Sequence, residues 1–123
     1  MDLDNRLPHK IIGCAMNVHN ELGNGFQEVI YQRALEIEFQ EARLDYAREQ
    51  EMPIFYKGQV IGARRADFWI DNRVLVELKA ILQLEDVHLA QGLNYLTAYQ
   101  LDTGLILNFG AAKLEIKRLF RKK

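Results

Sequence analysis

The stretch RADFWIDNRVLVELK, residues 65–79, decides the fold of this chain. Two mostly apolar runs, Ala66 to Ile70 and Val74 to Lys79, flank the turn-forming residues Asp71-Asn72-Arg73. Strand-forming runs separated by three such residues predict a β-hairpin with a three-residue loop. We therefore expect two neighbouring strands of a sheet here, with Asn72 at the turn.

Pairing across this hairpin brings two carboxylates together. Asp67 and Glu77 each lie five residues from Asn72, so a turn about Asn72 places them opposite each other. Cross-strand partners share a face, with Cβ atoms about 4.5–5.5 Å apart. Lys79 points to the same side because it lies two residues beyond Glu77. Two facing carboxylates repel each other, which raises the pKa of one of them or destabilises the pair. A divalent cation removes that repulsion. Two carboxylates plus water are what a Mg²⁺ site usually offers.

The same three residues also fit a solvated outer strand face, on which Lys79 is the ion-pair partner of the two acids. The flanking residues favour a functional site. Trp69 and Leu75 place apolar side chains on the charged face, and the opposite face is apolar throughout: Phe68, Ile70, Val74, Val76, Leu78 and Ala80. Three ionisable groups in such surroundings indicate a site rather than a solvated rim.

The rest of the chain predicts helices, then strands, then a helix, then strands. The expected elements are a helix from Asn5 and Pro8 to a stop at Gly23, a helix from Phe26 to Ala42, a hairpin of Met52 to Tyr56 and Gln59 to Ile61, a helix from Glu85 to Gln100, and strands from Leu105 to Phe109 and Leu114 to Phe120. The inward face of the second helix is expected to carry Ile30, Ala34 and Ile37, with Tyr31, Leu35 and Phe39 as further candidates. This order predicts an α/β domain with a mixed sheet and helices packed on it.

Length and composition bound the class of protein. The chain has 123 residues, of which 49% are hydrophobic and 27% charged, and this is room for a single domain. Its uncharged stretches are far shorter than the about 20 apolar residues of a membrane span. Asp2 and Asp4 stand where a secretory signal carries basic residues. One cysteine, Cys14, excludes an internal disulfide and favours a core position in a reducing, cytoplasmic setting.

Charge is unevenly distributed. The net charge of −1 argues against a protein that coats nucleic acid by bulk electrostatics. The C-terminal segment 113–123 holds six Lys or Arg residues and one Glu, a net +5, which leaves −6 for the rest. Such a basic tail fits contact with phosphate and fits a solubilising chain end equally well. The acidic remainder is compatible with a cation site.

Two further motifs lie on the predicted helices. Gly25, Glu28 and Tyr31 have the spacing Gly-x-x-Glu-x-x-Tyr at a helix start, and Glu28 and Tyr31 share a face. Alone, this fits an acid favoured by the helix dipole and a core tyrosine. Gln91 and Tyr95 lie four residues apart on the later helix, which alone is a polar stripe. His88, one turn earlier, is more typical of a structural or surface residue.

Together these residues resemble the GxxExxY family of the PD-(D/E)XK nuclease-like superfamily. The matching positions run in order along nearly the whole chain: Gly25, Glu28, Tyr31, Asp67, Glu77-Leu78-Lys79, Gln91 and Tyr95. The surrounding sequence is similar as well at Ile11 to Gly13, Val18-His19, Tyr56-Lys57-Gly58 and Leu107-Asn108-Phe109-Gly110. Ala66 stands where the superfamily name has proline, at a position that varies within the superfamily.

The resemblance implies a restriction-endonuclease-like core, a mixed central sheet flanked by α-helices, over residues 1–123. It implies that Asp67 and Glu77 ligate Mg²⁺ or Mn²⁺, with Glu28 as a further ligand or water-holder. Lys79 would orient or activate the attacking water. Tyr31, Gln91 and Tyr95 would contact the substrate backbone or support the site.

We therefore expect a metal-dependent phosphodiesterase that acts on nucleic acid, DNA in particular. No sequence-reading module is evident, so a homodimer or a partner protein is expected to help hold duplex DNA. The alternative is a catalytically silent binding or assembly module with the same fold, which the low net charge favours. A toxin- or defence-associated accessory protein is a third interpretation. The cytoplasm is the expected location, without membrane attachment.

Overall fold

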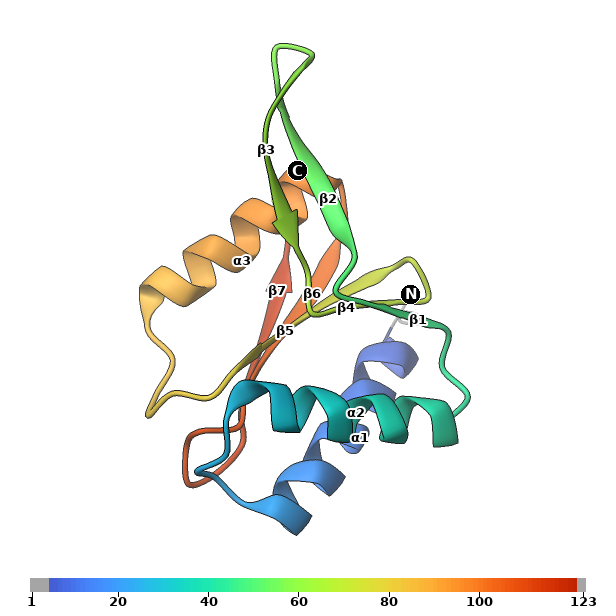
Figure 1. Ribbon diagram of the computed structural model, residues 1–123, viewed down its shortest axis with the longest axis vertical. Helices are drawn as coiled ribbons and strands as arrows, with labels where there is room; N and C mark the ends of the chain where they lie inside the picture. The colour runs from blue at the N-terminus through green and yellow to red at the C-terminus, as the bar shows by residue number, and fades with distance from the viewer. Residues whose placement is uncertain (1–4, 122–123) are drawn as a thin grey trace.

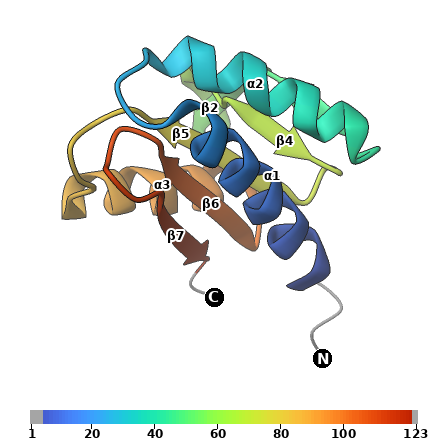
Figure 2. The same ribbon diagram turned by 90° about the horizontal axis from the view of Figure 1, so that it is seen from below.

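The computed structural model describes residues 5–121. Their main sheet has five strands and lies between two helical layers (Figures 1 and 2). Helices α1 (Arg6–Leu22) and α2 (Glu28–Glu41) cover one face, and α3 (Asp86–Tyr99) covers the other. This confirms the predicted single α/β domain with a mixed sheet. No helix in the described part of the chain is long and apolar enough to cross a membrane.

The sheet places β5 at its centre. Its strands are β1 (Tyr46–Arg48), β4 (Phe68–Ile70), β5 (Val74–Lys79), β6 (Thr103–Asn108) and β7 (Glu115–Phe120), in the order β1-β4-β5-β6-β7. Strands β5 and β6 are parallel, joined by the crossover through α3, and the other neighbours are antiparallel. Strand β5 therefore has a neighbour on both sides and a helix layer on both faces.

Alternate residues of the sheet feed two separate cores. Toward α1 and α2 the sheet presents Phe68, Ile70, Val74, Val76, Leu78, Leu105 and Leu107, and Cys14 joins this core from α1 as predicted. Toward α3 it presents Trp69, Leu75, Ile106 and Leu119, which pack on Leu96. Glu77 lies on the α3 side of β5, because it alternates with Val76 and Leu78.

The predicted inward face of α2 is confirmed in part, because Ala34 and the three further candidates pack in the core but the two isoleucines do not. Ile30 and Ile37 are 36% and 56% exposed, whereas Tyr31, Leu35 and Phe39 are fully buried. The Tyr31 ring stacks on Phe109 with ring centroids 4.7 Å apart, and Phe39 packs edge-on against Phe68. These large rings bury more apolar surface than the isoleucines do, and a shift of one position turns a helix by about 100°.

The segment between β1 and β4 forms a hairpin outside the main sheet. Strands β2 (Glu51–Tyr56) and β3 (Gln59–Arg65) pair around Lys57 and Gly58, which have φ angles of 49° and 78°, and project from the body of the molecule (Figure 1). Positive φ at both turn residues is typical of a two-residue hairpin turn. The tip exposes large apolar side chains, with Phe55, Tyr56, Val60 and Ile61 each 61–65% exposed.

Much of the basic C-terminal segment belongs to the sheet. Lys117 and Arg118 lie on the edge strand β7, and Arg121 pairs with Asp102 at 3.0 Å. Charged side chains on an edge strand discourage pairing with another chain. Lys122 and Lys123 lie outside the described residues.

A buried asparagine fixes the chain that follows β5. The Asn108 Oδ1 atom accepts hydrogen bonds from the backbone N–H groups of Ile81 (3.0 Å) and Gly110 (3.1 Å), and its Nδ2 donates to Glu115 (2.7 Å). Gly110 lies against this loop so closely that a Cβ atom there would collide with the backbone N and O of Ile81. The end of β6 therefore fixes the position of the segment that follows Lys79.

Gly110→Ala should lower the free energy of unfolding by about 1–3 kcal/mol, because the added methyl group overpacks a contact with backbone atoms that cannot rotate away. The matched control is Gly13→Ala on α1, where a Cβ meets nothing within 4 Å. Alanine there should raise stability by about 0.5–1 kcal/mol, since glycine is a poor helix former. Urea denaturation of both variants measures the difference, and effects of the same sign would contradict the close approach at Gly110.

Candidate active site

The hairpin of β4 and β5 has the predicted register. Phe68 pairs with Val76, Trp69 with Leu75 and Ile70 with Val74, so the turn is centred on Asn72. Asp71 and Asn72 adopt φ angles of 55° and 53°, which small polar residues tolerate best after glycine. The regular pairing ends at Phe68, and Asp67 lies one residue before it.

Asp67 lies where an antiparallel ribbon leaves the sheet. β1 pairs with β4, and β2 pairs with β3 in the same register, so the two pairs form one ribbon that turns outward beside Asp67. The Asp67 Oδ2 atom accepts a hydrogen bond of 2.8 Å from the backbone N–H of Leu78 on β5. The Asp67 carboxylate thus accepts a hydrogen bond from the Leu78 N–H group, which lies beyond the part of β5 that pairs with β4. This bond fixes the Asp67 side chain against β5.

Glu77 is buried beside Asp67. Glu77 is 7% exposed, and its Oε1 atom has no hydrogen-bond partner. Burial, then the charge of Asp67, then a hydrogen bond to Asp67 raise the pKa of Glu77 to about 9, and Arg64 and Lys79 lower it by less. The Glu77 carboxyl therefore carries a proton at neutral pH in the metal-free chain and donates it toward Asp67. The predicted repulsion between the two acids is confirmed in this form.

Glu28 approaches the pair from the start of α2. Burial raises the pKa of its carboxyl, the charge of Asp67 raises it further, and Lys79 and Arg64 lower it. Tyr31 lies one turn later and is fully buried. Its hydroxyl donates to the carbonyl of Gly23 at 2.6 Å and accepts from the N–H of Phe26 at 3.2 Å. Tyr31 thereby anchors the loop that presents Glu28.

Glu77 and Lys79 line a small pocket together with Gln91 and Tyr95 of α3. The structure therefore brings two of the predicted hairpin residues and the predicted α3 residues to one pocket, which Asp67 does not line. His88 also borders the pocket, and its Nδ1 atom accepts a hydrogen bond from the N–H of Glu85 at 2.9 Å, which caps α3. The structural role expected for His88 is confirmed.

Sequence reasoning missed Gln32 and Arg64. The Gln32 Nε2 atom donates to Asp67 Oδ1 at 3.3 Å, and its Oε1 accepts from Arg48 at 2.9 Å. The available signal was its position four residues after Glu28, on the same stripe of α2. Arg64 of β3 borders the pocket of Glu77. Nothing local to the sequence marks Arg64, because its place depends on how the hairpin docks on α3.

The donor set fits a hard divalent cation. No group of three or more His, Cys, Asp or Glu side chains gathers to hold a metal within residues 5–121, so Glu28 does not complete a three-acid cluster with Asp67 and Glu77. Mg²⁺ usually takes one or two carboxylates and keeps several waters. The buried Glu77 Oε1 atom lacks a partner, and an unsatisfied buried oxygen is costly. A divalent cation held by Asp67 and Glu77 would satisfy it.

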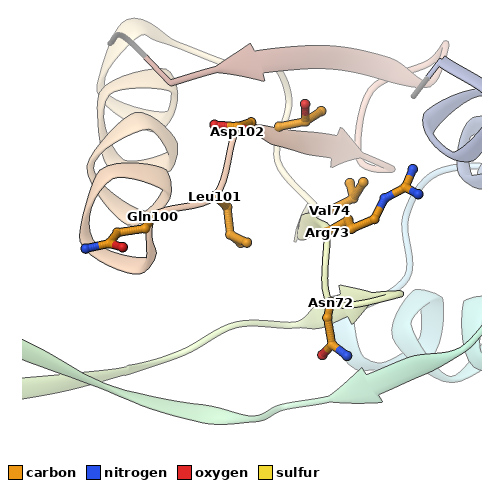
Figure 3. A pocket seen from close by; sticks show the side chains of 7 residues that line it. Asn72, Arg73, Val74, Gln100, Leu101 and Asp102 are labelled. Atoms are coloured by element: carbon orange, nitrogen blue, oxygen red, sulfur yellow. The ribbon is translucent and has the colours of Figure 1, made fainter. Parts of the chain in front are cut away.

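A larger hollow lies at the other end of β5. It has a volume of about 310 Å³ and lies between the β4–β5 turn and the α3–β6 connection, lined by Asn72, Arg73, Val74, Gln100, Leu101, Asp102 and Thr103 (Figure 3). It contains no pair of facing acids. Ligands of α/β sheets bind beyond the carboxyl ends of parallel strands, and Lys79 is at that end of β5.

In a metal chelator, the stability of the wild-type protein should fall as the pH rises from about 5 to 9. The folded state keeps the Glu77 proton up to a pKa of about 9, whereas the unfolded chain releases it near 4.5, so rising pH favours unfolding. Each pH unit in this window contributes at most about 1.4 kcal/mol.

Glu77→Gln imitates the protonated carboxyl and should remove this slope, leaving the variant more stable than wild type at high pH. Glu41→Gln, at the exposed end of α2, should keep the wild-type slope. Urea denaturation at three pH values measures all three proteins. A wild-type slope that survives Glu77→Gln assigns the proton to another group.

Comparison with known proteins places this fold and site in context. The curated proteins contain no match to this chain. Among solved structures, the chain is similar to the crystal structure of SSO0001, with a TM-score of 0.59 and 19% sequence identity. The similarity covers 76% of this chain and 50% of that one, so this chain spans about half the length of SSO0001. At this identity the likeness shows a shared fold.

The family comparison covers the whole site. The sequence pattern of the PD-(D/E)XK nuclease superfamily matches residues 5–119. This range includes α2, α3 and β5, which carry candidate residues, and Asp67 before β4. The chain therefore belongs to the PD-(D/E)XK nuclease superfamily.

Proposed function

We propose that this chain is a metal-dependent phosphodiesterase of the GxxExxY family that hydrolyses nucleic acid, DNA in particular. The observation that carries the proposal is the carboxyl pair of buried Glu77 and half-buried Asp67, with Lys79 two residues beyond Glu77 on β5. Membership of a nuclease superfamily supports the reaction class. Fold alone does not establish a function, so the proposal depends on these side chains.

Asp67 and Glu77 are the proposed ligands of Mg²⁺ or Mn²⁺, and Glu28 is a further ligand or holds a water beside them. When bound, the ion neutralises charge on the scissile phosphate and lowers the pKa of the attacking water. The hydrogen bonds from Leu78 and Gln32 keep the Asp67 carboxylate fixed. Tyr31 contributes indirectly, because it anchors the loop before Glu28.

Lys79 supplies a positive charge at the reacting group. It forms no ion pair within residues 5–121 and is close enough to lower the pKa of both Glu77 and Glu28. Its ammonium group orients the attacking water and stabilises negative charge as the water oxygen bonds to phosphorus and the bond to the leaving oxygen breaks. Gln91 and Tyr95 contact the substrate backbone from α3.

The assembly of the protein on duplex DNA is part of the proposal. The net charge of −1 gives a single copy little electrostatic attraction for a duplex. A homodimer or a partner protein would supply the missing contact area.

Lys79→Ala should lower the rate of metal-dependent DNA cleavage by about 10²–10³-fold, because one charge that stabilises the transition state is lost. Lys10→Ala, on the exposed surface of α1, should cleave as wild type does. The assay uses single-stranded, duplex and branched DNA, and RNA, with Mg²⁺ or Mn²⁺. A wild type that binds Mn²⁺ and cuts none of these substrates indicates a binding module instead.

Mg²⁺ or Mn²⁺ should raise the melting temperature of wild type and leave that of Asp67→Asn unchanged. A ligand that binds only the folded state stabilises it by about 2.7 kcal/mol at a hundredfold excess over Kd. Asp45→Asn, at an exposed acid before β1, is the matched control and should respond to metal as wild type does. Equal shifts in wild type and Asp67→Asn would count against ligation by Asp67.

A further inference from the structure

Arg64 of β3 is held in the wall of the pocket that contains Glu77 and Lys79. Its guanidinium carbon lies 4.5 Å from the ring centroid of Tyr95 on α3. Its backbone carbonyl accepts a hydrogen bond of 3.5 Å from the hydroxyl of Tyr99, one turn farther along the same helix. Both the side chain and the backbone of Arg64 are therefore positioned by α3, although β3 belongs to the projecting hairpin.

The charge of Arg64 is not used in an ion pair. It has no carboxylate partner within residues 5–121, and its Nε atom is buried without a hydrogen bond. Neighbouring Arg65 differs in each respect, since its side chain is 60% exposed and pairs with Glu51 at 3.8 Å. Adjacent residues of a strand face opposite sides, so Arg64 faces the pocket and Arg65 faces solvent.

The electrostatic effect of Arg64 extends across the site. It lowers the pKa of Glu77, Glu28 and Tyr95. With Lys79, it gives the pocket two cationic side chains beside the carboxyl pair. A guanidinium without a carboxylate partner at the edge of a pocket is suited to a phosphate, because its planar fork of N–H groups can donate to two phosphate oxygens.

We propose that Arg64 is a phosphate-binding residue that takes a backbone phosphate of the nucleic-acid strand, next to the phosphate at Asp67 and Glu77. This rests on the proposed function to the extent that nucleic acid is the ligand. The ring of Tyr95 holds the guanidinium in place, so little side-chain freedom is lost on binding. The β2–β3 hairpin thereby becomes part of the substrate-binding surface.

The test compares Arg64→Met with Arg65→Met, two changes of the same residue type at adjacent positions. Both are made in the Lys79→Ala protein so that the DNA stays intact. Fluorescence anisotropy with a labelled DNA of about 12 nucleotides, single-stranded and as a duplex, gives Kd in Mg²⁺ between about 50 and 200 mM salt. Arg64→Met should weaken binding about 10- to 100-fold, as expected for a hydrogen bond to a charged group.

The salt dependence identifies the contact as a phosphate. The slope of log Kd against log salt should fall by about 0.7 for the single strand or about 0.9 for the duplex in Arg64→Met, and should not change in Arg65→Met. Arg64→Lys keeps the charge and should keep the slope while it loses part of the affinity. Melting curves confirm that each variant is folded.

Neutral methylphosphonate linkages locate the contacted phosphate. One substituted position should weaken binding to the Arg64 protein and add no further loss in Arg64→Met. Inorganic phosphate distinguishes a strand contact from a general anion site, and displacement of the DNA by free phosphate at about 10 mM would overturn the strand assignment. Equal changes in Arg64→Met and Arg65→Met, or none in either, would overturn the proposal itself.

Cleavage assays separate this inference from the proposed function. Wild type that binds DNA through Arg64 but cuts no substrate supports the phosphate contact and contradicts the nuclease. With Lys79 intact, cleavage whose KM is unaffected by Arg64→Met supports the nuclease and contradicts the contact. If both hold, Arg64→Met raises KM and leaves kcat nearly unchanged, because the contact is to a phosphate that does not react.

Discussion

The separation of one β-ribbon from the sheet beside Asp67 is the constraint on which the site depends. On one side of Asp67, strand β4 of the ribbon pairs with β5, beginning at Phe68. On the other side, the ribbon continues outward as β2 and β3. The Asp67 carboxylate then takes the backbone N–H of Leu78. This places Asp67 against the central strand β5, beside Glu77, which is buried on that strand. Gln32 and Arg48 link the Asp67 carboxylate to α2 and β1, so three elements meet at one side chain.

Two different sets of contacts position Asp67 and the chain after Lys79. Asp67 is fixed by polar contacts to α2, whereas the chain after Lys79 is fixed by buried Asn108 and by the close approach of Gly110. The first belongs to the layer of α1 and α2, and the second belongs to the end of β6. The position of Asp67 and the path of the chain after Lys79 therefore depend on different parts of the fold.

The features that sequence predicted well depend on short-range geometry. The β4–β5 register follows from the symmetry of fifteen residues about Asn72, and the sheet fixed it as expected. The side of α2 that faces the core was predicted only in part, because it depends on the packing of Tyr31 on Phe109 and of Phe39 on Phe68, partners that lie 78 and 29 residues away. The place of Arg64 was not predicted for the same reason, because it reaches Tyr95 only once the β2–β3 hairpin has docked on α3. The resemblance of the spaced motifs to a known family identified Gln91 and Tyr95, which no local pattern distinguishes from an ordinary polar stripe.

The two strands of the hairpin that carries Arg64 begin and end at one paired position, where Glu51 lies opposite Arg65. Residues added to or removed from both strands beyond Arg64 change the length of the arm and leave its root in register. Loops and hairpins whose ends are already adjacent tolerate such changes in length at small cost. The arm is therefore a natural graft point: its outer half, from Ile54 to Gly62, can be exchanged for another hairpin without disturbing the strand that leads into Asp67. Reach and surface chemistry at the tip can thus be redesigned independently of the acids at the root.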